Sequence, residues 1–278
     1  MRWRDQRRSD NIEDRRGMGG RTVAIGGGGL GVIVILIAAL VCGVDPRNLL
    51  EAQQDAQQQQ QTQPNQPPKK DDDSEFASTV LASTEDVWND IFRRNNISYR
   101  EPKLVLFRDQ TASACGYADK AMGPFYCPGD EKLYLDFAFF DELRREFKAP
   151  GDFAQAYVIA HEVGHHVQNL LGTMDQVTRA QQRSGQAGAN QLSVRLELQA
   201  DCFAGIWAAA ADKKGLVEAG DAEEAIRAAA AVGDDMIQKR TRGYVVPESF
   251  THGSSRERME WFARGFKTGD VKQCRTFE

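Results

Sequence analysis

Two histidines and the glutamate between them form the motif of this chain that is best suited to chemistry. His161, Glu162 and His165 make the pattern H-E-x-x-H. Residues four apart share a face of a helix, so both imidazoles can bind one metal ion while the glutamate serves as a general base. The chain has only four histidines, and three of them fall between positions 161 and 166. Surface or packed histidines are the alternative, but this concentration favours a metal site.

A catalytic zinc site keeps three protein ligands and one open position, so a third ligand must come from elsewhere. Glu197 and Asp201 are also four residues apart, in a helix predicted over residues 191–213 with Asn190 as its cap. Glu197 can bind the ion, and Asp201 can accept a hydrogen bond from a ligating imidazole. In isolation, these carboxylates fit a solvated helix face equally well. Beside H-E-x-x-H they predict a Zn²⁺ cofactor held by His161, His165 and Glu197.

Together these motifs resemble the gluzincin metallopeptidases, which carry H-E-x-x-H on one helix and E-x-x-x-D on the next. More narrowly, the chain is similar to the bacterial neutral zinc metallopeptidases. The resemblance covers nearly the whole chain outside a polar linker, and it is carried by residues 7–16, 123–128, 161–166, 197–202 and 250–255. It implies a zincin-like metallopeptidase domain. The order of the predicted elements, a small sheet followed by a mainly helical remainder, indicates that this domain is α+β.

The resemblance also implies an activity. We expect a membrane-anchored, zinc-dependent endopeptidase that hydrolyses peptide bonds in a peptide or protein substrate. Zinc would activate a water molecule, and Glu162 would take the proton of that water and pass it to the leaving amine. The alternative is a non-catalytic, zinc-containing binding or chaperone-like module of the cell envelope.

Four further residues could belong to the site or support it. Gluzincins often carry a histidine or tyrosine that stabilises the oxyanion, and His252 is our candidate for this catalytic role, with Tyr244 in reserve. A capping or packed histidine is the alternative for His252. Arg258 resembles an arginine that follows the equivalent histidine in some membrane gluzincins. We expect His166 to pack or to support the site, because a third ligand from one helix would crowd the metal.

The net charge of −5 conceals a division along the chain. Residues 1–21 hold seven arginines and four acidic residues, a net of +3, so the remainder carries −8. Nucleic-acid binding requires clustered Lys and Arg that replace the counterions around phosphates. The acidic remainder of the chain is unsuited to binding phosphates, so we expect no nucleic-acid partner.

The segment after the basic residues is apolar enough to cross a membrane. Residues 22–44 contain no charged residue and would span about 34 Å as a helix, against a hydrocarbon core of roughly 30 Å. With residues 1–21 as a cytoplasmic head, we expect a single-pass protein of the bacterial inner (cytoplasmic) membrane, with its catalytic domain on the periplasmic or extracellular side. A cleaved signal peptide is the alternative. Residues 26–31 match G-x-G-x-x-G, but no strand and helix flank them as nucleotide binding requires.

A polar segment separates the apolar one from the rest of the chain. Residues 45–75 are rich in Gln and Pro and offer almost nothing apolar to bury, so they predict a disordered linker. Residues 76–278 remain as one zinc metallopeptidase domain, large enough to bury a core.

Apolar periodicity indicates the first elements of that domain. It predicts a helix over residues 78–95 and strands over residues 103–107 and 132–136. The plain interpretation of the second strand is an interior strand, and our hypothesis is that it forms a sheet edge along which an extended peptide can align.

The helix that carries H-E-x-x-H also has predicted ends. Asp152 is expected to cap it, with Gln155 in the capping-box position, and Gly172 is expected to end it. The Gln- and Gly-rich residues 181–189 are expected to form a loop before the second zinc helix.

Four cysteines outside the apolar segment suit an oxidising compartment, and four cysteines allow three pairings. Proximity favours Cys115 with Cys127, which leaves Cys202 with Cys274. A structural zinc site made from these thiols is the alternative, but no C-x-x-C spacing supports it. We therefore expect two disulfide bonds.

Overall fold

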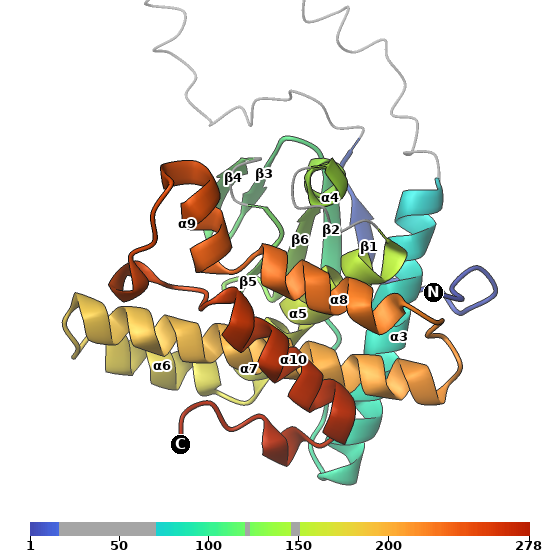
Figure 1. The fold of residues 1–278 in the computed structure, drawn as a ribbon. Coiled ribbons are helices and arrows are strands. Elements are labelled where there is room, and N and C mark those ends of the chain that lie inside the picture. The colour runs from blue at the N-terminus through green and yellow to red at the C-terminus, as the bar shows by residue number, and fades with distance from the viewer. Residues whose placement is uncertain (17–70, 120–122, 146–150) are drawn as a thin grey trace, which may run out of the picture. The chain divides into compact units, whose positions relative to one another are not determined.

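The computed structural model describes residues 1–16, 71–119, 123–145 and 151–278. Met1–Arg15 and Lys70–Glu278 form one compact unit. This unit combines small sheets with a mainly helical remainder (Figure 1), so the predicted α+β class is confirmed.

A four-stranded sheet forms one side of the unit. Its order is β1 (Ile12–Asp14), β2 (Lys103–Phe107), β6 (Lys132–Asp136) and β5 (Phe125–Cys127). The first three strands are parallel, and β5 runs antiparallel to β6. Strands β2 and β6 bury nearly every residue, as central strands covered on both faces do. A separate hairpin joins β3 (Gln110–Ser113) and β4 (Gly116–Asp119).

The two predicted strands have the bounds of β2 and β6. The hypothesis that residues 132–136 form an edge is wrong, and their plain interpretation as an interior strand is confirmed. Strand β6 lies between β2 and β5. The edge belongs to β5, whose three residues are too few to show a strand pattern in the sequence. Strand β5 comes just before β6 in the chain, and the turn between them pairs it antiparallel with the side of β6 opposite β2.

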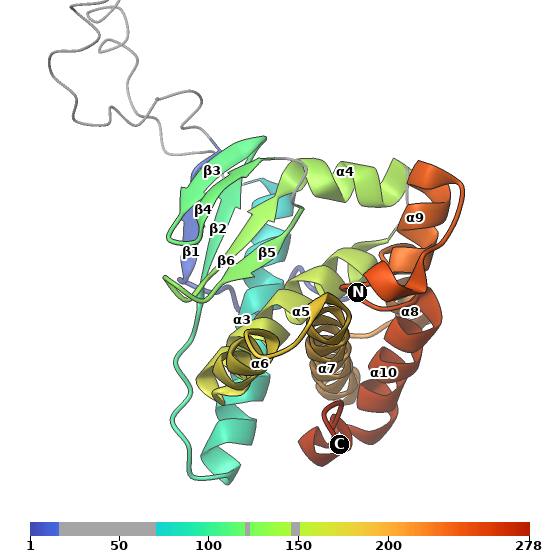
Figure 2. The same cartoon turned by 90° about the vertical axis from the view of Figure 1, so that its left-hand side faces the viewer.

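The helices pack in layers against the sheet. Figure 2 shows α5 between the sheet and α7, with α10 on the far side of α7. The helices are α3 (Asp72–Arg94), α4 (Phe137–Arg145), α5 (Asp152–Leu170), α6 (Thr173–Gln181), α7 (Gln186–Lys213), α8 (Asp221–Ala231), α9 (Asp234–Arg242) and α10 (Ser255–Thr268), with short 3-10 turns η2 (Pro247–Ser249) and η3 (Val271–Gln273). Because it is covered by the sheet and by α7, α5 is buried along almost its whole length.

Helix α3 begins six residues earlier than predicted. Asp71 accepts a hydrogen bond from the backbone N–H of Ser74, and the Ser74 hydroxyl accepts one from the backbone N–H of Asp71. This reciprocal cap starts the helix inside the acidic stretch that composition assigned to the linker. The expected linker end at residue 75 is therefore wrong by about one helical turn.

The starts of the two zinc helices also differ from the prediction. Helix α5 begins at Asp152, but its N-cap is Gly151 and no side chain caps it. The Asp152 carboxylate instead accepts a hydrogen bond from the ammonium group of Met1 at 2.9 Å. Helix α7 begins at Gln186, so residues 186–189 of the loop expected over residues 181–189 are helical. No proline interrupts the helix in this stretch.

The first fifteen residues belong to this unit. Strand β1 pairs with β2, and the side chains of Arg7, Ser9 and Asn11 all donate hydrogen bonds to Glu85, which is buried on α3. The expectation of a separate head over residues 1–21 is therefore wrong for residues 1–15. Composition could not reveal this, because arginines that pair with a domain and arginines that stay in the cytoplasm give the same net charge.

The predicted membrane helix over residues 22–44 lies outside the described residues, as does the linker up to residue 70. Among the residues that the structure describes, no helix combines the length and the apolar character that a membrane crossing needs.

The packing of residues 1–15 makes a prediction about sidedness. Residues 1–15 and 71–278 must lie on the same side of any membrane, because they form one unit. We expect a membrane-impermeant maleimide, applied to spheroplasts, to label Asp5→Cys and Lys239→Cys alike, either both or neither. Both positions are exposed, and each variant would be made in a Cys42→Ser background. Lysed cells control for reactivity, and labelling of only one position would contradict the packing.

The cysteine pairing is confirmed. Cys115 is bonded to Cys127, and Cys202 is bonded to Cys274. The second bond joins α7 to the C-terminal segment, 72 residues further along the chain. In the chain-entropy model, closing so long a loop stabilises the folded state by about 4 kcal/mol.

Candidate metal centre

The predicted site lies where α5 and α7 cross. A Cβ atom on Gly164 would lie 3.0 Å from the carbonyl oxygen of Ala200 and 3.1 Å from its Cα. Because Gly164 has no side chain, α7 can approach the backbone of α5 closely. This contact places residues 197–201 of α7 against residues 161–165 of α5.

Helix α10 approaches α7 even more closely. A Cβ on Gly265 would lie 2.0 Å from the carbonyl oxygen of Cys202, and one on Gly205 would lie 2.2 Å from that of Phe262. Neither position has room for any side chain. The crossing carries Arg258, near the start of α10, to the same part of α7 as Asp201.

The three predicted metal ligands lie together. One ligand atom from each of His161, His165 and Glu197 falls within 4.8 Å of the others. The Nε2 atom of His161 is 3.1 Å from one carboxylate oxygen of Glu197, and the Nε2 atom of His165 is 3.3 Å from the other. Both histidines are buried. One carboxylate thus faces both imidazoles.

Asp201 holds the opposite side of the His161 ring. The Nδ1 atom of His161 donates a hydrogen bond to Oδ1 of Asp201 at 2.9 Å, so its Nε2 atom is directed towards Glu197. This is the predicted relation of Asp201 to a ligating imidazole. Such a bond fixes the tautomer and the orientation of the ring.

Asp201 is itself held by two buried residues. Arg258 donates from Nε to Oδ2 at 2.8 Å and from Nη2 to Oδ1 at 3.0 Å, a bidentate pair. The hydroxyl of Tyr157 donates to Oδ1 at 2.5 Å. All three side chains are almost fully buried. The role of Tyr157 was missed in the sequence, where its only signal is that it lies four residues before His161 on one helix face.

The residues present fit a divalent zinc ion. Zinc ligands at 2.0–2.2 Å in tetrahedral geometry are about 3.4 Å apart, close to the two distances between His Nε2 and Glu197. Glu162, Glu197 and Asp201 bring three negative charges and Arg258 one positive charge, which leaves −2 when the histidines are neutral. Buried charge needs a partner. A divalent cation supplies it.

The pKa values in the cluster show the same demand for positive charge before a metal binds. Burial lowers the pKa of His161, but the charge of Asp201 and its hydrogen bonds with Asp201 and Glu197 outweigh burial and raise the pKa to about 10. The pKa of His165 is also raised, because Glu197 outweighs burial. Burial raises the pKa of Glu197, but the two histidines lower it well below its ordinary value.

These shifts predict that zinc and protons compete. A His161 with a pKa of about 10 is protonated at neutral pH, so zinc must displace its proton. The apparent zinc affinity should therefore rise with pH between pH 6 and 8, by about tenfold per pH unit for each proton displaced. Chelator competition at several pH values measures this. An affinity that stays constant over that range would contradict the prediction.

Glu162 lies beside the cluster without belonging to it. Its side chain is about nine-tenths buried, and burial raises the pKa of the carboxyl despite the opposing effect of His165 and His161. A carboxylate whose pKa is raised towards neutrality is a better general base than an exposed one. The environment of Glu162 therefore suits the role predicted for it.

His252 lies on the segment between η2 and α10. Its ring is half-exposed and approaches Oδ1 of Asp234 at 3.2 Å, a contact that raises the pKa of the imidazole. The neighbouring Gly253 packs against Val194 and Leu198 of α7, within one turn of Glu197. His252 is therefore next to the Glu197 side of the centre. The reserve candidate, Tyr244, is more exposed, and nothing in the structure ties it to the ligands.

His166 faces away from the metal ligands. Its Nε2 atom donates to the carbonyl of Arg100 at 2.6 Å, so its Nδ1 atom accepts a hydrogen bond from the hydroxyl of Tyr126 at 3.1 Å. The ring also packs edge-on against Tyr99. Burial lowers the pKa of His166, which keeps the imidazole neutral. His166 thus connects α5 to strand β5 and to the segment before β2, as the packing interpretation expected.

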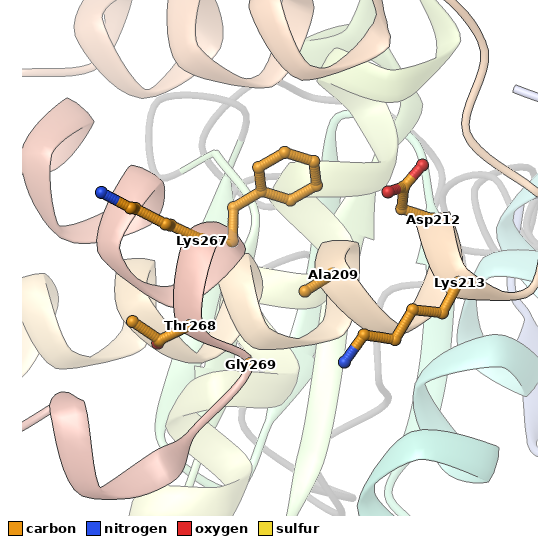
Figure 3. A pocket seen from close by; sticks show the side chains of 7 residues that line it. Ala209, Asp212, Lys213, Lys267, Thr268 and Gly269 are labelled. Carbon is orange, nitrogen blue, oxygen red and sulfur yellow. The ribbon is translucent and has the colours of Figure 1, made fainter.

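Two other features of the described residues are not part of the centre. Asp152, Asp221 and Glu224 also cluster, but the ammonium group of Met1 lies 2.9 Å from Asp152 and 3.3 Å from Asp221, and Glu224 accepts a hydrogen bond from the backbone N–H of Phe153 at 3.3 Å. A cavity of about 360 Å³ lies at the C-terminal ends of α7 and α10. Figure 3 shows the side chains that line it. Its lining includes Lys213 and Lys267 but no residue of the predicted site.

Comparison with known proteins identifies the family. The family model described as "Putative neutral zinc metallopeptidase" matches residues 1–277. The chain belongs to this family. The family implies a Zn²⁺ cofactor, and it is the family that the sequence motifs indicated.

Similar proteins occur in Escherichia coli and Mycobacterium tuberculosis. The chain is 48% identical to the uncharacterized protein YpfJ of Escherichia coli K12 over 285 residues, which covers 100% of this chain and 99% of the relative. It is 45% identical to the uncharacterized protein Rv2575 of Mycobacterium tuberculosis H37Rv over 206 residues, covering 70% of this chain and 67% of the relative. No solved structure matches the chain.

Proposed function

We propose that this protein is a zinc-dependent endopeptidase of the gluzincin type, with a zincin-like catalytic domain. The observation that carries the proposal is the convergence of His161, His165 and Glu197 within 4.8 Å, with Glu162 beside them. Their donor set of two imidazoles and one carboxylate leaves a tetrahedral ion one open position, as catalytic zinc sites require.

The roles of the residues follow from their positions. Zinc bound at the centre supplies Lewis acidity, which lowers the pKa of water and polarises a carbonyl group. Glu162 accepts the proton of the attacking water and later donates it to the leaving amine. His252, beside the Glu197 helix, donates a hydrogen bond to the oxyanion of the substrate. Asp201 keeps His161 in the tautomer that presents Nε2.

The sheet edge beside the zinc helix aligns the substrate. Among the described residues, no strand pairs with the outer side of β5. The hydroxyl of Tyr126 on β5 accepts a hydrogen bond from Asn169 at 3.0 Å and contacts His166, both on α5. These contacts hold the edge next to the catalytic helix. An extended peptide that pairs with β5 by backbone hydrogen bonds is thereby placed near Glu162.

The two disulfide bonds indicate the cellular compartment in which we expect this activity. Bonds such as Cys115–Cys127 and Cys202–Cys274 persist in oxidising compartments. We therefore place the compact unit outside the cytoplasm, anchored by residues 22–44. Residues 1–15 pack with the unit and lie on the same side. A single crossing by residues 22–44 would leave residues 1–15 on the opposite side, so residues 22–44 would hold the unit at the membrane without a single crossing.

Hydrolysis of casein or of a peptide library by the full chain tests the proposal. A chelator should abolish cleavage, and added Zn²⁺ should restore it. A protein that binds zinc but cleaves nothing would overturn the enzyme proposal and favour the non-catalytic binding module.

A further inference from the structure

Gln168 is a fully buried polar residue that lies three positions after His165 on α5. Its Oε1 atom lies 2.9 Å from Nδ1 of His165. Its Nε2 atom donates to the carbonyl of Leu196 at 2.7 Å, and Leu196 is the residue just before Glu197 on α7. One side chain therefore touches a proposed metal ligand on α5 and the backbone beside another on α7.

The backbone carbonyl determines which way these bonds run. A carbonyl oxygen can only accept a hydrogen bond, so the nitrogen of Gln168 must face Leu196 and its oxygen must face His165. That oxygen can only accept, so Nδ1 of His165 carries the proton. The Nε2 atom of the neutral ring is then left with its lone pair, and it is this atom that lies 3.3 Å from Glu197.

A second amide confirms the direction independently. Nε2 of Gln199 donates to the carbonyl of Cys274 at 2.9 Å, which turns its Oε1 towards Nε2 of Gln168 at 3.2 Å. The donors thus run in one direction, from His165 through Gln168 and Gln199 to Cys274. The disulfide to Cys202 holds the last acceptor in place.

We propose that Gln168 is a positioning residue for the zinc ligand His165, and that it does for this ring what Asp201 does for His161. This inference rests on the proposed zinc centre. Gln168 fixes the ring with Nε2 towards the metal and holds the Leu196–Glu197 backbone of α7 at the matching distance. It touches neither substrate nor metal itself.

The inference predicts a loss of zinc affinity when the acceptor is removed. Methionine has nearly the length of glutamine, but its thioether sulfur is only a weak acceptor for the hydrogen bond from Nδ1. In the full chain, we expect Gln168→Met to weaken zinc binding by about 10- to 100-fold in a chelator competition. Gln168→Glu retains an acceptor for Nδ1 but loses the donor to the carbonyl of Leu196, so it should bind zinc more tightly than Gln168→Met and less tightly than wild type.

Two controls separate positioning from general damage to the fold. Gln155→Met makes the same change at another buried glutamine of α5, far from His165, and should leave zinc affinity unchanged. Nitrogen-15 NMR of the histidine rings in the zinc-loaded protein reports the tautomer directly. Gln168→Met should disturb the pattern of His165, while His161, held by Asp201, keeps Nδ1 protonated.

The possible outcomes distinguish a failure of the Gln168 proposal from a failure of the proposed zinc-dependent function. If wild type binds no zinc, both the proposed function and this inference are overturned. If wild type binds zinc and folded Gln168→Met binds it equally well, only the inference is overturned. An equal loss in Gln168→Glu and Gln168→Met would also overturn it, because the acceptor would not be what matters.

Discussion

Replacement of Glu162 by glutamine should abolish peptide hydrolysis while zinc stays bound. The substitution preserves the shape of the side chain but removes the group that accepts a proton from water. General-base catalysis contributes about 10²- to 10⁴-fold to a rate, so we expect Glu162→Gln to lose about that much activity. Glu162 is not one of the three residues whose ligand atoms cluster, so the amount of zinc bound per chain should not change. Peptide cleavage and metal analysis of the same preparation measure both.

A matched substitution at a ligand should behave differently. Glu197→Gln makes the same chemical change on α7, but it removes the carboxylate that faces both His161 and His165. We expect this variant to lose zinc and activity together. If Glu162→Gln keeps activity within tenfold of wild type, Glu162 is not the base. If it loses zinc as Glu197→Gln does, Glu162 is a ligand instead.

Replacement of Arg258 should have the largest effect on stability. Its guanidinium is buried and forms a bidentate pair with Asp201, so Arg258→Met leaves a buried carboxylate without its cation. Breaking one side of a buried ion pair costs about 3–5 kcal/mol. The melting temperature of this compact unit should fall by on the order of 10 °C. Thermal unfolding followed by circular dichroism measures the change.

The same helix offers a control for this substitution. Arg256 lies two residues earlier and also pairs with a carboxylate, that of Glu260, but its side chain is 83% exposed. Arg256→Met should leave the melting temperature unchanged, because solvent screens that pair. Asp201→Asn combined with Arg258→Met should recover part of the stability, since both buried charges are then absent. A melting temperature for Arg258→Met within 2 °C of wild type would show that the pair is not important for folding.

Much of the centre could be predicted from short-range spacing. His161 and His165 share a helix face because they are four residues apart, and the same holds for Glu197 and Asp201. Local chemistry also indicated strands 103–107 and 132–136. The disulfide between Cys202 and Cys274 followed by elimination, once the nearer pair was assigned. In each case the relevant information lies within one helix, within one strand or in the small number of possible cysteine pairings.

The features that were wrong or missed depend on contacts between distant segments. Residues 1–15 join the sheet because β2 and Glu85 accept them, and no property of the arginines themselves distinguishes that outcome from a separate head. Strand β5 is too short to recognise by pattern and makes β6 an interior strand. Residues 17–70, on which the predicted anchor lies, are outside the part of the chain that the structure describes.

The sequence by itself determined which side chains have the chemistry for a zinc centre and which of them share a helix face, because helical periodicity is a property of the local backbone. Only the tertiary structure decided how the two helices meet. The missing side chain of Gly164 lets α7 approach, Asp201 and Gln168 orient one imidazole each, and Arg258 arrives from a third helix to balance the charge. These relations depend on the register between separate helices, which long-range packing sets and local spacing does not encode.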